Sequence, residues 1–154
     1  MFRGWLVALC LVLFSAPVFA EEAAKEAKDK PPIPDAKVFS SEHSMKLDGE
    51  TIKYSATAGE TYLYNEKDEP TASIFSTSYI REGVSDATSR PVTFVFNGGP
   101  GSASLWLHMG AFGPKRVVTP SDATGVGAPP YAIVDNQNSL LDVTDLVFID
   151  PVGT

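Results

Sequence analysis

The stretch that decides the fold lies at residues 94–106 and reads FVFNGGPGSASLW. An apolar strand leads into a glycine-rich turn, and Ser102 is a residue type that caps helices, here at the start of a helical pattern. A turn of this kind directs several backbone N–H groups at one spot beside the positive end of a helix. Such a spot can hold a carboxylate or the oxyanion of a reacting carbonyl.

Other kinds of turn share parts of this pattern. Asn97-Gly98 alone favours a type I′ hairpin turn, but a helical pattern follows it rather than a returning strand. A phosphate-binding loop would end in Gly-Lys-Ser/Thr, and a dinucleotide-binding fingerprint has a different glycine spacing. The sequence therefore favours a cradle for a carbonyl or a carboxylate.

Residues 1–20 have the pattern of a secretory signal peptide. Arg3 gives a basic start, residues 5–14 are apolar, and Ala20 ends a run suited to cleavage. The apolar run is shorter than the roughly 20 residues that span a bilayer, which favours cleavage over an uncleaved anchor. We expect a secreted or periplasmic protein that is cut after Ala20 and has no stable membrane insertion afterwards.

The composition restricts the partners further. Cys10, the only cysteine, lies inside the predicted signal peptide, so the mature chain has no disulfide. The formal net charge is −7 and the chain has no Lys/Arg cluster, which argues against nucleic acid or an anionic membrane as partner. Residues 21–37 are rich in Ala, Lys, Glu, Asp and Pro and predict a disordered linker.

The rest of the chain predicts hairpins followed by buried strands. Strands are expected at 44–58, 60–64 and 71–80, with a strong turn signal at Asp48-Gly49 and a second turn at Gly59-Glu60. Residues 92–96 and 145–150 are nearly continuous apolar runs, typical of strands buried on both faces. A helix with an apolar face follows Ser102 and ends at Gly113-Pro114, before a short strand near 115–118 and a loop at 119–130.

These elements predict an α/β fold in which antiparallel hairpins lead into a mostly parallel sheet. Two strands of the buried type need helices on both faces, and the sequence offers one convincing helix. We therefore expect residues 38–154 to be the N-terminal portion of a larger, here incomplete, domain. The alternative is a complete small domain.

The same motifs resemble the serine carboxypeptidase family of α/β-hydrolase peptidases. The family pattern is Asn-Gly-Gly-Pro-Gly, then Cys or Ser, a small residue and Ser, with Gly-Pro closing the segment. Residues 97–104 and Gly113-Pro114 are similar to it, and so are residues 146–154, LVFIDPVGT, to the family's next strand and turn. We expect a bacterial-type member and the N-terminal portion of an α/β-hydrolase domain.

The resemblance implies roles for three residues of the turn. Gly99 matches the glycine whose backbone N–H donates to the oxyanion. Asn97 and Gly98 match positions that hold the C-terminal carboxylate of the substrate, and an amide and a backbone N–H suit that anion. The resemblance therefore implies a peptide with a free C-terminus as substrate, and no cofactor or metal.

Two departures from the family pattern leave the chemistry open. The family often has Glu two residues before the closing Gly-Pro, where this chain has Ala111, so an esterase or acyltransferase stays an alternative. Arg116, just downstream, could supply a positive charge to the terminal carboxylate instead. An arginine at this position is more typical of a solvated surface residue.

The second departure from the family pattern is the missing nucleophile motif. No Gly-x-Ser-x-Gly elbow occurs, and the nearest match, residues 83–87, leaves no room for the helix that must follow. His43 is expected at the surface. His108 is expected opposite or beside the helix's apolar face, where it could line the cleft. Asp145 and Asp150 are typical of structural turns. We assign no catalytic triad to this chain and expect it to be inactive alone. A secreted, non-enzymatic anion-binding module is the remaining alternative.

Overall fold

The computed structural model describes residues 32–99, 101–122, 124–125 and 127–154. The chain divides into two units, Met1–Asp35 and Ala36–Thr154, and all described helices and strands belong to the second. The predicted signal peptide and most of the predicted linker lie outside the described residues, while residues 32–37 are exposed and have no regular structure. Within the described part, no helix has the length and apolar character needed to cross a membrane.

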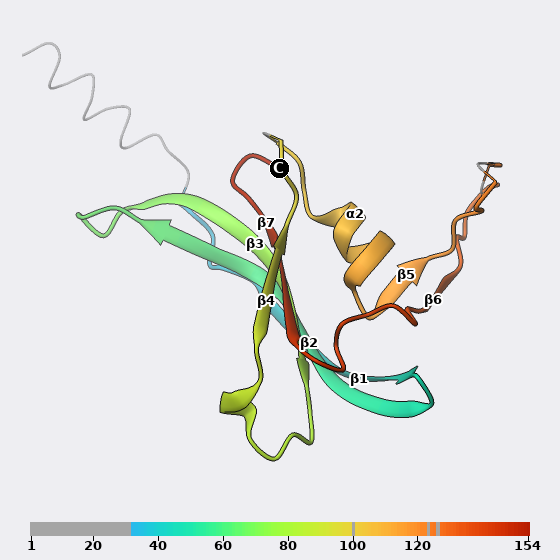
Figure 1. Cartoon of the computed structure of the whole chain (residues 1–154). Helices are drawn as coiled ribbons and strands as arrows, with labels where there is room; N and C mark the ends of the chain where they lie inside the picture. Colours follow the sequence, from blue (N-terminus) through green and yellow to red (C-terminus); the bar gives the residue numbers. More distant parts are fainter. Residues whose placement is uncertain (1–31, 100, 123, 126) are drawn as a thin grey trace, which may run out of the picture. The chain divides into compact units, whose positions relative to one another are not determined.

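The second unit is built mainly from strands (Figure 1). In chain order the elements are β1 (Val38–Leu47), β2 (Glu50–Tyr64), β3 (Pro70–Arg81), η1 (Ala87–Ser89), β4 (Val92–Phe96), α2 (Leu105–Leu107), η2 (His108–Phe112), β5 (Lys115–Val117), β6 (Ile133–Asp135) and β7 (Asp145–Asp150). One sheet has five strands in the order β1-β2-β3-β7-β4, and β5 and β6 form a separate pair. Among the described strands only β4 and β7 pair in parallel, so the main sheet is mixed and mainly antiparallel, which corrects the prediction of a mostly parallel sheet.

The β1–β2 hairpin forms as the sequence predicts. Asp48 and Gly49 have φ values of 49° and 84°, and two successive positive φ angles are the signature of a type I′ turn. Their strands pair from Leu47↔Glu50 to Val38↔Gly59. The first strand is longer than expected, since β1 begins at Val38 rather than near residue 44.

The turn predicted at Gly59-Glu60 is wrong. β2 continues through both residues, and Gly59 is buried where the backbone of β1 passes closely. A Cβ atom on Gly59 would lie 2.8 Å from the carbonyl oxygen of Lys37 and from Cγ2 of Val38. Glycine is therefore required here by close approach and not by a turn.

The core lies on one face of the main sheet, around the β1–β2 hairpin. Its fully buried apolar residues are Met45, Leu47, Ile52, Tyr54, Leu141, Leu146 and Phe148. All but one of them come from β1, β2 and β7, and Leu141 comes from the connection before β7. Alternating residues of each strand supply this face, as the two-residue period of a strand requires.

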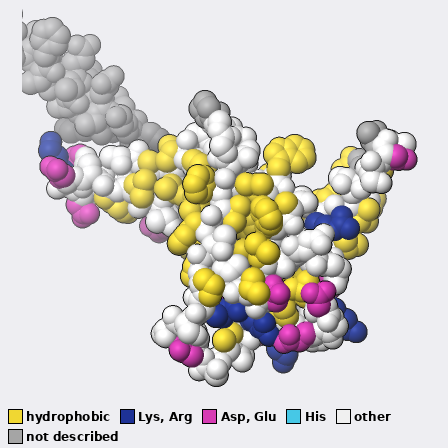
Figure 2. Space-filling model, viewed as in Figure 1, with side chains coloured by type: hydrophobic (Ala, Val, Ile, Leu, Met, Phe, Trp, Pro, Cys, Tyr) yellow, Lys and Arg dark blue, Asp and Glu magenta, His cyan; other side chains and the backbone are white. Residues whose placement is uncertain are grey.

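The other face of β4 is exposed, which corrects the prediction of a strand buried on both sides. Val92, Phe94 and Phe96 are 50%, 61% and 62% exposed, while the intervening Val95 packs against the core. Figure 2 shows hydrophobic side chains gathered around β4 on the face turned to the viewer. Within the described residues, this side of the sheet has no covering helix.

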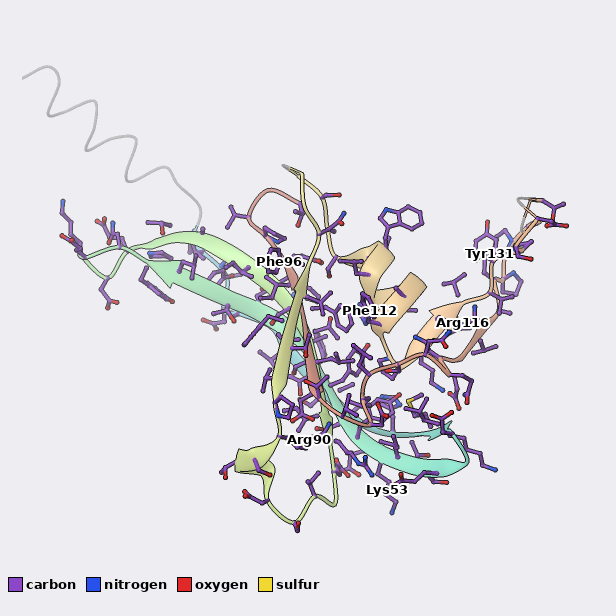
Figure 3. The ribbon with its side chains drawn as sticks, in the orientation of Figure 1. Lys53, Arg90, Phe96, Phe112, Arg116 and Tyr131 are labelled. Atoms are coloured by element: carbon purple, nitrogen blue, oxygen red, sulfur yellow. The ribbon has the colours of Figure 1, made fainter. Side chains whose placement is uncertain are left out.

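An ion pair fixes the start of β4 against the start of β7. The Nε of Arg90 lies 3.0 Å from Oδ1 of Asp145, and the same guanidinium donates to the carbonyls of Leu141 and Asp142. Figure 3 shows Arg90 at one end of β4 and Phe96 at the other. Because β4 and β7 are parallel, their carboxyl ends meet at the Phe96 end.

Candidate functional site

The glycine-rich loop leaves the sheet at the carboxyl ends of β4 and β7. Phe96 pairs with Ile149, and the chain then runs through residues 97–104 before α2 begins at Leu105. Open α/β sheets bind their ligands at this edge. Asn97 is half-buried, whereas Gly98 and Gly99 are exposed. The residues predicted to bind substrate are therefore reachable from solvent.

Two glycines of the loop have backbone angles that other residues rarely adopt. Gly99 has φ +83° and Gly101 has φ +76°. A Cβ on Gly101 would lie 3.7 Å from the carbonyl oxygen of Gly153, so the loop passes beside the turn after β7. The structure thus brings together the two motifs on which the family resemblance depends.

The side chain of Asn97 bridges the loop. Its Nδ2 donates to Oγ of Ser102 over 2.8 Å. Because an amide nitrogen carries two hydrogens, this bond uses one of them. Asn97 thus presents its amide at the start of the loop, held by one hydrogen bond, one residue before the exposed Gly98.

Asp150, the last residue of β7, holds the other end of the loop. Its Oδ1 accepts from the backbone N and from Oγ of Ser104, each over 2.7 Å. Ser104 is 3% exposed and precedes the helix, and its carbonyl accepts from the backbone N of His108. The prediction that Ser102 caps the helix is therefore wrong, because a carboxylate 46 residues away fixes the start at Ser104. Asp150 has a structural role, as expected, but from the end of a strand.

The helix does not bury the face that its spacing predicts. Leu105 and Phe112 are 56% and 38% exposed. The side chain that meets the sheet is His108, whose ring stacks on Phe148 with centroids 4.4 Å apart and an interplanar angle of 20°. Its Nε2 lies 2.6 Å from the hydroxyl oxygen of Tyr79 on β3.

Burial governs the titration of both members of this pair. Burial lowers the pKa of His108, and the nearby negative charge of Asp150 opposes that change in part. Burial, with a smaller contribution from Tyr54, raises the pKa of Tyr79 to about 12. Tyr79 therefore keeps its proton, and its hydroxyl shares a hydrogen bond with Nε2 of His108 whose direction depends on the tautomer of the ring. His108 anchors the helix to the sheet, and its Nε2 is already engaged.

The other histidine forms a contact that sequence reasoning missed. His43 lies exposed within β1, and its Nε2 is 2.7 Å from Oγ of Ser41. Its ring also stacks on Tyr54 at 5.5 Å. Residues i and i+2 of a strand share a face, so the spacing Ser-x-His could have indicated this pair. No aspartate or glutamate contact to His43 is found among the described residues, so the pair lacks the orienting acid of a triad.

The weak Gly-x-Ser-x match at residues 83–87 lies away from the loop. It precedes η1 and β4, whereas the glycine-rich loop follows β4. Asp86 of this segment accepts from the backbone N of Thr88 and caps η1. The segment therefore forms a capped turn, without the long helix of a nucleophile elbow, as expected.

Ala111 and Arg116 are the last two residues that the sequence singled out near the carboxylate-binding loop. The carbonyl of Ala111 accepts from Nδ2 of the buried Asn136, which also donates to the carbonyl of Gly113 and so fixes the end of η2. The methyl group at residue 111 offers nothing to a carboxylate. Arg116 lies half-buried on β5, and Figure 3 shows it apart from the loop at the end of β4.

The comparisons with known proteins give a partial likeness to a solved structure. No family model matches the chain, and no curated protein matches it. Among solved structures, a prohormone-processing carboxypeptidase from Saccharomyces cerevisiae is similar over 64% of this chain, with 26% sequence identity and a TM-score of 0.46. The chain spans 20% of the length of that protein. That structure comes from a yeast, so a bacterial type stays a prediction.

Proposed function

We propose that this chain supplies the oxyanion and carboxylate-binding loop of a secreted, serine-type carboxypeptidase-like hydrolase. One observation carries the proposal: Gly99 is exposed, with φ +83°, at the carboxyl edge of a parallel strand pair. Its loop is held at both ends, by Asn97 bonded to Ser102 and by Ser104 bonded to Asp150. A loop that is fixed before substrate arrives needs no reorganisation when charge develops.

The roles within the loop follow from the chemistry of its donors. The backbone N–H of Gly99 donates to the oxygen of the scissile carbonyl as that oxygen becomes an oxyanion. The Asn97 amide and the Gly98 N–H receive the terminal carboxylate of the peptide. The absence of side chains at Gly98 and Gly99 lets the substrate approach the backbone closely. One oxyanion donor accounts for roughly a hundred- to thousand-fold in kcat in hydrolases of this chemistry.

The nucleophile and its base belong, in this proposal, to a longer domain. A serine attacks the last peptide carbonyl, and a histidine takes its proton and returns it to the leaving amine. The exposed face of β4, with Phe94 61% and Phe96 62% exposed, supports the idea that further elements cover the sheet. His108 has no part in this step, because its Nε2 is engaged by the hydroxyl of Tyr79 over 2.6 Å.

An esterase or acyltransferase is the second candidate, and Ala111 favours it. A peptidase that selects free C-termini binds the terminal carboxylate of its substrate more tightly when a second side chain hydrogen-bonds to it. Residue 111 is alanine here and provides only a methyl group. In a longer form that carries the nucleophile, ester cleavage without release of C-terminal residues would reject the peptidase proposal in favour of this one.

A serine-hydrolase probe on the purified chain tests where the nucleophile lies. We expect no stoichiometric labelling by a fluorophosphonate, together with weak binding of blocked peptides that end in a free carboxylate. The Ser41→Ala variant is the matched control, because Ser41 is bonded to His43. Stoichiometric labelling of the chain would contradict the proposal that the nucleophile lies outside it. If Ser41→Ala then abolished the labelling, Ser41 would be identified as the nucleophile.

A further inference from the structure

The four asparagines of this chain differ sharply in how their side-chain amides are held. Asn97 is half-buried, and the residue after it, Gly98, is exposed, with no atom within 4 Å of the position its Cβ would take. Gly98 is followed by Gly99, so two consecutive residues without side chains adjoin the Asn97 amide. Gly98 therefore places no side chain beside its own backbone nitrogen that could hinder an approach to Asn97.

Two of the other asparagines are held by several hydrogen bonds. Asn136 is fully buried, and its Nδ2 donates to two carbonyls while its Oδ1 accepts from the backbone N of Asn138. Asn65 accepts at Oδ1 from the backbone N of Lys67 and of Glu69 and donates to the Glu69 carboxylate. Neither amide can turn toward the following peptide nitrogen without breaking these bonds.

The fourth asparagine provides the closest internal comparison. Asn138 is exposed, like the loop around Asn97. The residue after it, Ser139, is buried, and its Oγ donates to the carbonyl of Phe112. The peptide after Asn138 is thus fixed by a side chain that Gly98 lacks. Asn97 itself is held by one hydrogen bond, from Nδ2 to Oγ of Ser102, and a glycine follows it. Of the four asparagines, it therefore combines a lightly held amide with a following peptide that carries no side chain.

We infer that Asn97 is a site of spontaneous deamidation within the folded protein. The backbone nitrogen of Gly98 attacks Cγ of Asn97, so a bond forms between them and the Cγ–Nδ2 bond breaks. The amide nitrogen leaves as ammonia, with the proton that the Gly98 nitrogen gives up, and a five-membered succinimide remains. Solvent water then opens the ring at either carbonyl and leaves aspartate or isoaspartate at residue 97.

The product changes the loop in two ways. Converting Nδ2 to an oxygen removes the donor to Oγ of Ser102, which spans the loop over 2.8 Å. It also places a negative charge two residues before Gly99, and like charges at short range repel. Deamidation would therefore weaken anion binding with time. This consequence rests on the proposed function, whereas the chemical step does not.

Peptide mapping by mass spectrometry tests the chemical step. The folded chain is incubated at mildly alkaline pH, and the conversion of each asparagine is followed together with isoaspartate formation. We expect Asn97 to convert several-fold faster than Asn138, with Asn65 and Asn136 slowest. In urea the conversion of Asn65 and Asn136 should become faster, because unfolding breaks their hydrogen bonds. Conversion of Asn97 only after unfolding would overturn the inference.

A matched variant tests the steric argument. Gly98→Ala adds a methyl group in open space, so it should fold while slowing conversion of Asn97 several-fold. An unchanged rate in Gly98→Ala would also overturn the inference.

The consequence has a separate readout. Asn97→Asp should bind a blocked free-acid peptide more weakly than the unmodified chain, and equal binding would overturn the claim that deamidation weakens the loop. If the unmodified chain binds no such peptide, the proposed function fails while the mapping result stands.

Discussion

Removing the Asp150 carboxylate tests whether β7 fixes the start of the helix after the glycine-rich loop. In the Asp150→Ala variant, the backbone N and Oγ of Ser104 both lose their acceptor. Ser104 is 3% exposed, so water does not readily replace the carboxylate. A buried donor left without a partner costs about 1–3 kcal/mol. We therefore expect Asp150→Ala, which leaves two such donors, to lower the free energy of unfolding by about 2–6 kcal/mol, a large part of a typical domain's stability.

A double-mutant cycle assigns this loss to the contact itself. Ser104→Ala removes only the hydroxyl donor and should cost about 1–2 kcal/mol in the unmodified chain. In the Asp150→Ala background the same change should cost almost nothing, since the hydroxyl no longer has its acceptor. The coupling free energy is then about 1–2 kcal/mol, measured by urea unfolding followed by circular dichroism.

Ser102→Ala is the matched control for the cycle. It removes a hydroxyl from the same loop, but its partner is Asn97 rather than Asp150. Its effect should add to that of Asp150→Ala within about 0.5 kcal/mol. The reasoning is refuted if Ser104→Ala costs the same in both backgrounds, or if Asp150→Ala lowers the free energy of unfolding by less than about 0.5 kcal/mol.

Further predictions concern the pH dependence of stability, close packing and ion pairs. Burial lowers the pKa of His108 below its ordinary 6.5, so the unfolded chain binds this proton more readily than the folded chain. Stability should therefore rise with pH toward about 6.5 and then level off, and His108→Asn should flatten this part of the urea-unfolding profile. Gly59→Ala forces a Cβ to 2.8 Å from its neighbours and should cost about 1–3 kcal/mol, whereas Gly110→Ala, in open space, should be neutral or stabilise the helix by up to about 1 kcal/mol; equal thermal shifts would contradict this. Arg90→Ala removes the cation from a largely buried carboxylate and should cost about 3 kcal/mol or more, while Lys115→Ala, from a more exposed pair, should cost at most about 1 kcal/mol; similar losses in urea unfolding would argue against the role given to Arg90.

Local sequence signals predicted the elements whose causes are local. Asp48-Gly49 forms the expected hairpin turn, because positive φ angles at two successive residues are a property of those residues. Residues 92–96 and 145–150 form β4 and β7 at the expected bounds. The glycine-rich turn between strand and helix also lies where its pattern predicts.

Long-range contacts explain what the sequence could not show. Gly59 looks like a turn residue, but its neighbours Lys37 and Val38 lie at the start of β1, about 20 residues earlier in the chain. The helix starts at Ser104 rather than Ser102 because Asp150 accepts from it across the parallel strand pair.

Two further differences between prediction and structure, at β6 and at the face of β4, also arise from long-range contacts. β6 was not predicted, since its short segment Ile133–Asp135 is largely exposed and depends on pairing with β5. The exposed face of β4 could not be expected either, because an apolar run does not show what covers it.

The measurement that tests the central claim most directly is a nuclear magnetic resonance titration of the backbone amide of Gly99. The ligand is a blocked dipeptide with a free C-terminal carboxylate, and the control is the same dipeptide as its C-terminal amide. We predict saturable shifts of the Gly98 and Gly99 N–H signals and of the Asn97 side-chain amide with the free acid, and much smaller shifts with the control. Unchanged signals at all three residues, or equal shifts with both ligands, would contradict the assignment of this loop as an anion-binding site.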